Sequence, residues 1–86
     1  MKRFTVLWHP LLEGDLTEIW INAGDPHPVE DAANQVEQLL SMRPESAGEQ
    51  ISNRGYQLEI SPLHLIYRIH PEDRTVRVVS VLRSDI

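Results

Sequence analysis

The stretch at residues 64–79, HLIYRIHPEDRTVRVV, decides the fold because it holds two apolar runs joined by a short charged turn. Both runs are rich in β-branched, aliphatic and aromatic residues, which favour strands, and the Pro-Glu-Asp-Arg sequence between them favours a turn. We therefore predict a β-hairpin with strands at Leu63–His70 and Thr75–Arg83.

The two strands of this hairpin should each have one apolar and one polar face, because successive side chains of a strand point to opposite sides. The apolar face of the first strand carries Leu63, Leu65, Tyr67 and Ile69, and its other face carries His64, Ile66, Arg68 and His70. With unbroken alternation, the return strand adds Val76, Val78 and Leu82 to the apolar face and Arg77, Val79, Val81 and Arg83 to the other. The cationic side chains are therefore expected on a face that no helix covers.

The first half of the chain predicts one strand and two helices. Residues 3–8 are rich in β-branched and aromatic residues and precede a His-Pro pair that stops a strand. Apolar residues then recur at helical spacing from residue 12 to residue 23, with Trp20 as a core anchor and Gly24 as the C-cap. A second helix is expected from Pro28 until Arg43 and Pro44 stop it.

Residues 44–50 are predicted to form a loop by composition, and residues 56–61 a further strand. The expected order is β-α-α-β-β-β. We predict an α+β fold in which an N-terminal helical hairpin packs on one face of a small antiparallel sheet.

Length and composition restrict the class of protein. The chain has 86 residues, of which 41% are hydrophobic and 24% charged, as in a globular protein, and residues 1–86 are expected to form a single domain. It has no cysteine, which excludes disulfides and thiolate chemistry and fits a cytoplasmic location. No apolar stretch predicts a signal peptide or a membrane span. The four histidines share no spacing, so we expect neither a metal site nor a cofactor.

Charge is unevenly distributed along the chain, whose formal net charge is -5. Residues 1–50 hold three Lys or Arg and nine Asp or Glu, whereas residues 51–86 hold five arginines and four acids. An acidic chain is a poor general nucleic-acid binder, because affinity for phosphates comes largely from neutralising cations. A local arginine face can still hold one phosphate or one partner.

Three patterns spread over the chain resemble the RelE/ParE superfamily of bacterial type II toxins. They are P-x-x-x-x-D-L-x-x-I from Pro10 to Ile19, L-x-x-x-P from Leu40 to Pro44, and the hairpin pattern Y-R-I-x-x-E-D-x-x-V-x-V-x-x-V-x-R from Tyr67 to Arg83. The hairpin pattern is the most specific of the three.

The resemblance implies a growth-inhibiting toxin, encoded on a plasmid that it stabilises or on a chromosome, whose partner is an antitoxin from the adjacent gene. RelE-like members cleave mRNA in the ribosomal A site without a metal, whereas ParE-like members poison DNA gyrase, so the resemblance leaves open whether the chain is an enzyme. The only lysine is Lys2, and no histidine or aromatic residue follows the last strand. The scarcity of lysine and the lack of a histidine or aromatic residue after the last strand both favour a protein target, or a catalytically inactive member, over RNA cleavage. An unrelated small α+β interaction module is a further alternative.

The resemblance also implies which residues would act. The candidates for contacts with phosphate or with a partner are Arg54, Arg68, Arg77 and Arg83. His64 is the candidate general acid or base, because an imidazole titrates near neutrality, and Tyr56 the candidate for stacking on a base or donating a proton. The structural alternatives are surface arginines that keep an open sheet soluble, a half-exposed histidine and a tyrosine at the edge of the core.

Overall fold

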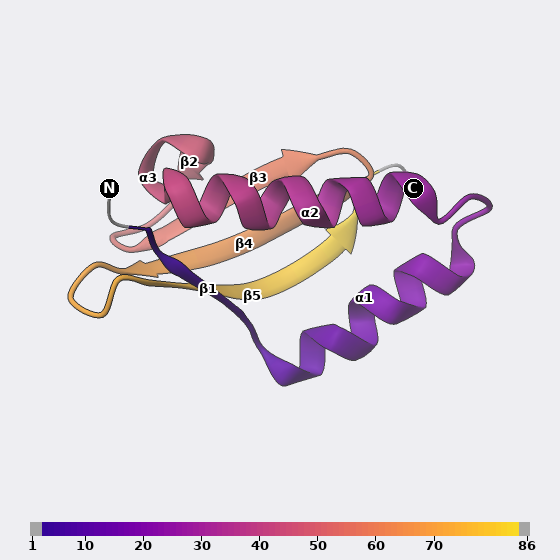
Figure 1. The fold of residues 1–86 in the computed structure, drawn as a ribbon, viewed down its shortest axis with the longest axis horizontal. Coiled ribbons are helices and arrows are strands. Elements are labelled where there is room, and N and C mark those ends of the chain that lie inside the picture. The colour runs from indigo at the N-terminus through magenta and orange to yellow at the C-terminus, as the bar shows by residue number, and fades with distance from the viewer. Residues whose placement is uncertain (1–2, 85–86) are drawn as a thin grey trace.

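The computed structural model describes residues 3–84 (Figure 1). Its elements are β1 (Thr5–Trp8), α1 (Pro10–Asn22), α2 (His27–Met42), α3 (Pro44–Ala47), β2 (Glu49–Gln50), β3 (Gly55–Ile60), β4 (Leu63–His70) and β5 (Thr75–Arg83). The predicted α+β order is confirmed, and both strands of the hairpin have the predicted bounds. No helix in this part of the chain is long and apolar enough to cross a membrane.

The five strands form one sheet in the order β1-β5-β4-β3-β2, and helix α2 lies along one of its faces (Figure 1). The prediction of an antiparallel sheet was wrong for one pair, because β1 runs parallel to β5. Two adjacent parallel strands need a long connection between them. Here the connection from β1 to β5 consists of the three helices and of strands β2, β3 and β4. The sheet is therefore mixed.

The segment between α2 and β3 was predicted to be a loop but contains the short helix α3 and the two-residue strand β2. A Cβ atom at Gly48 would overlap the carbonyl oxygen of Gln57 and the hydroxyl of Tyr67. Glycine therefore allows the chain to pass close to the sheet at this point. The helix ends also shift by a residue or two, since α1 begins at Pro10 and is capped by Ala23, and α2 begins at His27.

The core lies between α2 and the face of the sheet that α2 covers. Strand β4 contributes the apolar side chains predicted for it, and all four are buried: Leu63, Leu65, Tyr67 and Ile69. Helix α1 buries only Leu12, and Figure 1 shows it diverging from α2. The prediction that Trp20 anchors the core was wrong, because this side chain is 41% exposed and its indole N–H donates to Oε1 of Glu30 at 2.9 Å.

A β-bulge interrupts the alternation of β5. Tyr67 pairs with Val78, but the preceding residue of β4, Ile66, pairs with Ser80, so Val79 is an extra residue on β5. Beyond the bulge the two faces exchange, as expected when one residue is inserted into a strand of period two. Val81 is consequently buried, whereas Leu82 is 61% exposed, which is the reverse of the prediction.

Candidate functional site

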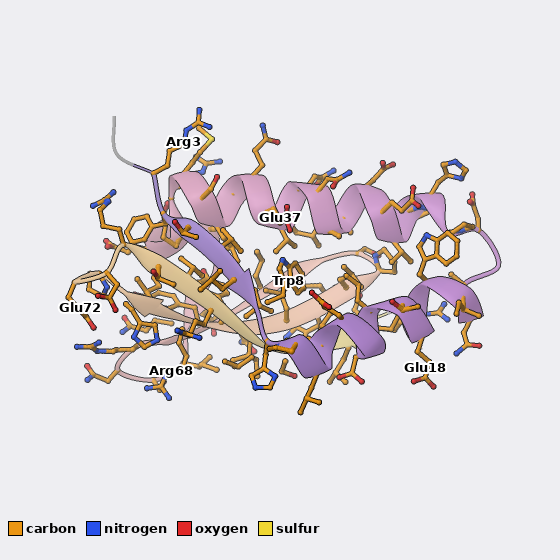
Figure 2. The ribbon with its side chains drawn as sticks, turned by 60° about the horizontal axis from the view of Figure 1, so that its bottom comes forward. Arg3, Trp8, Glu18, Glu37, Arg68 and Glu72 are labelled. Atoms are coloured by element: carbon orange, nitrogen blue, oxygen red, sulfur yellow. The ribbon has the colours of Figure 1, made fainter. Side chains whose placement is uncertain are left out.

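The open face of the sheet, away from α2, brings two arginines together. Arg68 on β4 and Arg77 on β5 are direct cross-strand partners, and both are exposed. Neither guanidinium has an ion-pair or hydrogen-bond partner among residues 3–84. Figure 2 shows Arg68 projecting from the side of the molecule opposite Arg3. Two unpaired guanidinium groups side by side have the chemistry to hold one anion, because each presents a rigid set of N–H donors.

Small and apolar residues surround this pair. Across the sheet, Gly55 on β3 is the partner of Arg68, and Leu7 on β1 is the partner of Arg77. The loop before β3 folds over Gly55, whose N–H donates to the Ser52 hydroxyl at 3.0 Å. Leu7 is 41% exposed, so part of the surface around the two arginines is hydrophobic.

His70 lies on the same face as Arg68, two residues further along β4, which corresponds to about 7 Å. Its Nδ1 atom is 3.8 Å from Oε1 of Glu72. We call Arg68, His70 and Arg77 the arginine patch. The two-residue alternation had already placed His70 on the face of Arg68, and this is the signal that would have identified it as a site residue.

Arg54 borders the arginine patch at its His70 end, because both side chains contact the same Oε1 atom of Glu72. Its Nη1 atom donates to Oε1 of Glu72 at 2.9 Å, joining the loop before β3 to the turn after β4. The pKa of Glu72 is lowered from its ordinary value, chiefly by a hydrogen bond from its own backbone N–H and next by Arg54. Arg54 is therefore held at the end of the hairpin.

His64 shares the open face but is paired with Leu82 and with Glu59. It lies four residues from Arg68, about 13 Å along the strand, which is roughly twice the separation of His70. His64 is therefore on the predicted face of β4, but it is not a neighbour of Arg68. A phosphate held by Arg68 would be much closer to His70 than to His64.

Tyr56 lies on the face that the helices cover, not on the open face. Its ring stacks on that of Tyr67, with the centroids 5.4 Å apart and an angle of 11° between the planes. Tyr67 is fully buried and donates from its hydroxyl to the carbonyl oxygen of Pro44 at 2.7 Å. Burial is the main reason that its pKa is raised to about 12. The stacked pair attaches α3 to the sheet.

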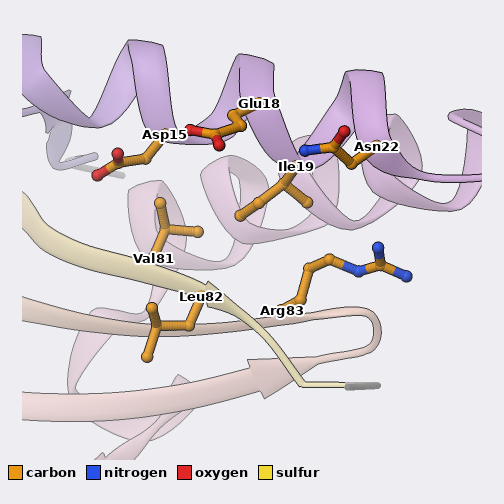
Figure 3. A pocket seen from close by; sticks show the side chains of 7 residues that line it. All are labelled: Asp15, Glu18, Ile19, Asn22, Val81, Leu82 and Arg83. Carbon is orange, nitrogen blue, oxygen red and sulfur yellow. The ribbon is translucent and has the colours of Figure 1, made fainter.

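Arg83 was predicted to lie on the open face, and that was wrong because the bulge precedes it. It pairs with Leu63, whose side chain is buried, and it lines a groove with residues of α1 (Figure 3). The predicted surface of four arginines is therefore only partly formed. Arg68 and Arg77 lie side by side, Arg54 borders them through Glu72, and Arg83 lies on the other side of the sheet. Within residues 3–84 no group of three or more His, Asp or Glu side chains is placed to hold a metal ion.

Solved structures share this fold. No protein-family model and no curated protein sequence matches the chain. A chain of the RelBE2 toxin–antitoxin complex from Mycobacterium tuberculosis superposes with a TM-score of 0.78 at 21% identity, covering 96% of this chain and 93% of that one. For E. coli toxin RelE in the free state, with two arginines mutated to alanine, the TM-score is 0.64 at 16% identity, covering 96% and 85%. For isolated E. coli RelE it is 0.56 at 20% identity, covering 94% and 84%.

These likenesses confirm the predicted α+β fold, which this chain shares with the solved RelE structures. They extend over nearly the whole chain, so that all the elements described above, from β1 to β5, belong to this fold.

Proposed function

We propose that this chain is the toxin of a type II toxin–antitoxin pair and that its target is mRNA on the ribosome. The observation that supports the toxin role is the fold, shared over 96% of the chain with a chain of a toxin–antitoxin complex. The partner is then an antitoxin encoded next to it. The arginine patch is the part of the surface that would act on RNA.

The chemistry required is attack of an RNA 2′ oxygen on the adjacent phosphorus, while the bond from phosphorus to the 5′ oxygen breaks. One proton leaves the 2′ hydroxyl and another reaches the 5′ oxygen. Arg68 and Arg77 would stabilise the negative charge that accumulates on the phosphate oxygens, since arginine binds phosphate with two parallel hydrogen bonds. His70 would carry one of the two protons, because an imidazole ring can both accept and donate one.

The test is induced expression with and without the adjacent small gene, followed by mapping of message ends and by cleavage assays on purified ribosomes. Arg68→Ala should lower the cleavage rate by about 100-fold or more, the usual cost of losing one donor to a developing oxyanion. Arg3→Ala is the matched control, because it removes the same charge on the opposite side of the molecule (Figure 2). Intact messages during growth arrest, or equal effects of the two variants, would exclude RNA cleavage by the patch.

The two histidines provide a second comparison. His70→Gln should lower the rate and remove one limb of its pH profile, whereas His64→Gln should leave both unchanged. The reverse result would assign the proton transfer to His64 and disprove the role of His70.

A second candidate target is a protein such as DNA gyrase. Two observations support this candidate: the net charge of -5, which weakens attraction to a polyanion, and the exposed Leu7 beside Arg77, which a protein partner could bury. Loss of supercoiling activity with intact messages would support this candidate, and normal supercoiling in the presence of the chain would exclude gyrase.

A further inference from the structure

The outer edge of β5 is only half paired. Strand β1 pairs with β5 from Thr75 to Val78 and then leaves it, with the N–H of His9 donating to the carbonyl of Val78 at 3.3 Å. From Val79 to Leu82 no other strand among residues 3–84 lies on this side of β5. The backbone groups that point outward here can therefore pair with an added strand.

Helix α1 runs beside this free edge and forms a groove with it (Figure 3). The groove has a volume of about 320 Å³, and its lining residues are Asp15, Glu18, Ile19, Asn22, Val81, Leu82 and Arg83. The apolar side chains come from both sides, since Ile19 belongs to α1 and Val81 and Leu82 to β5. Leu82 is 61% exposed, so a partner could bury it.

The wall that α1 contributes is acidic. Asp15 and Glu18 project from α1 toward the groove, and neither has an ion-pair partner among the described residues (Figure 3). They belong to a stretch, residues 10–42, that holds seven Asp or Glu and no Lys or Arg. An approaching segment would therefore be favoured if it carried positive charge.

We propose that this groove binds an extended segment of a partner protein that adds a strand to β5 and alternates apolar residues with lysine or arginine. Its backbone would pair with β5 between Val79 and Leu82. The spacing of the charges also fits. Asp15 and Glu18 are three residues apart on α1, so their Cβ atoms are about 5–6 Å apart, and alternate residues of the added strand would be about 7 Å apart. Two basic side chains of the segment can thus face Asp15 and Glu18 together.

An extended segment fits better than a helix because the free surface is a strand edge, whose N–H and C=O groups a helix cannot pair. Naming the antitoxin as the owner of this segment rests on the proposed function. The antitoxin would then bind its toxin through a basic stretch, as the acidic charge of this chain requires.

The probe for a test is a seven-residue peptide of alternating lysine and valine, acetylated and amidated, titrated into the purified full-length chain and followed by NMR of backbone amides. We expect shift changes at Ser80, Val81 and Leu82. Slower hydrogen exchange is expected at Val81, because N–H groups alternate in direction along a strand and those of Leu82 and Ser84 point to β4. The matched controls are the glutamate–valine peptide, which keeps the apolar residues, and a backbone N-methylated lysine–valine peptide, which cannot donate to the edge. Both control peptides should bind the chain at least tenfold more weakly than the unmodified lysine–valine peptide does.

Substitutions in the groove complete the test. Asp15→Asn together with Glu18→Gln should weaken binding about three- to tenfold, the effect of two exposed charge pairs. Glu13→Gln, on the other side of α1, should leave it unchanged.

Three results would overturn the inference: no shift changes along β5, equal binding of the glutamate–valine peptide, or concentration-dependent shifts showing that a second copy of the chain occupies the edge. The peptide titration does not depend on growth arrest. Arrest without peptide binding would therefore refute this inference alone, and peptide binding without arrest would refute the proposed function alone.

Discussion

Replacing Tyr67 by phenylalanine should lower the stability of the fold at neutral pH and raise it in strong alkali. The Tyr67 side chain is fully buried, and its hydroxyl donates to the carbonyl oxygen of Pro44 at 2.7 Å. The variant keeps the ring and its stacking on Tyr56 but leaves that carbonyl without this donor. The expected loss is about 1–2 kcal/mol of unfolding free energy at pH 7, the usual net effect of one buried hydrogen bond.

The alkaline reversal follows from the raised pKa of Tyr67, which burial places at about 12 in the folded chain. In the unfolded chain a tyrosine ionises near pH 10. The stabilising contribution is therefore complete below pH 10 and is lost as the pH rises through 12. Two units of pKa correspond to about 2–3 kcal/mol. In alkali the wild type therefore loses about 2–3 kcal/mol of unfolding free energy, which is more than the 1–2 kcal/mol that the hydroxyl contributes at pH 7. The plots of unfolding free energy against pH for the two proteins should therefore cross near pH 11.

The assay is urea denaturation of both proteins at intervals from pH 7 to pH 12, combined with ultraviolet titration of tyrosine ionisation. Tyr56→Phe is the matched control, because Tyr56 is partly exposed and its hydroxyl has no hydrogen-bond partner within residues 3–84. It should change stability by less than about 0.5 kcal/mol at neutral pH. Parallel curves for wild type and Tyr67→Phe across the alkaline range would refute the reasoning, as would equal effects of the two variants at neutral pH.

Three further substitutions test the packing by urea denaturation. Gly48→Ala should cost about 1–3 kcal/mol because its Cβ would meet backbone of β3, whereas Gly24→Ala, with open space around it, should cost less than 1; similar values for both would contradict the close approach. Leu65→Ala should cost about 2–5 kcal/mol and Leu82→Ala under about 0.5, and a large cost for Leu82 would disprove the bulge. Trp20→Phe should cost about 0.5–1.5 kcal/mol by removing the donor to Glu30, and no loss would show that this bond does not stabilise α1.

The fold was predictable where a buried face imposes strict alternation. Strand β4 followed the two-residue period at every position, because one side of it is covered along its whole length. The parallel pairing of β1 was not predictable in this way, since local sequence does not record which strand becomes a neighbour. The short helix α3 was missed because four residues are too few to show a helical period.

The candidate site was predicted less well, and the reasons differ between residues. For Tyr56 two roles were left open, and its sequence context favours the edge of the core, because Tyr56, Leu58 and Ile60 alternate with the polar Gln57 and Glu59 and so mark the covered face. The position of the Arg54 side chain is set by its ion pair with Glu72, which lies 18 residues away in the sequence. A local sequence pattern cannot predict such a pair.

The bulge at Val79 decides which side of the molecule each residue near the end of β5 serves. Any comparison of hairpin sequences that counts residues in pairs assigns Arg83 to the wrong surface, since the inserted residue shifts the count by one. Deleting Val79 would leave the pairing of Ser80 to Arg83 with β4 unchanged, whereas straightening the bulge with Val79 kept in the ladder would move Arg83 to the side of Arg68 and turn Val81 toward water. Whether β5 holds Val79 in a bulge or in the ladder therefore decides which surface Arg83 serves.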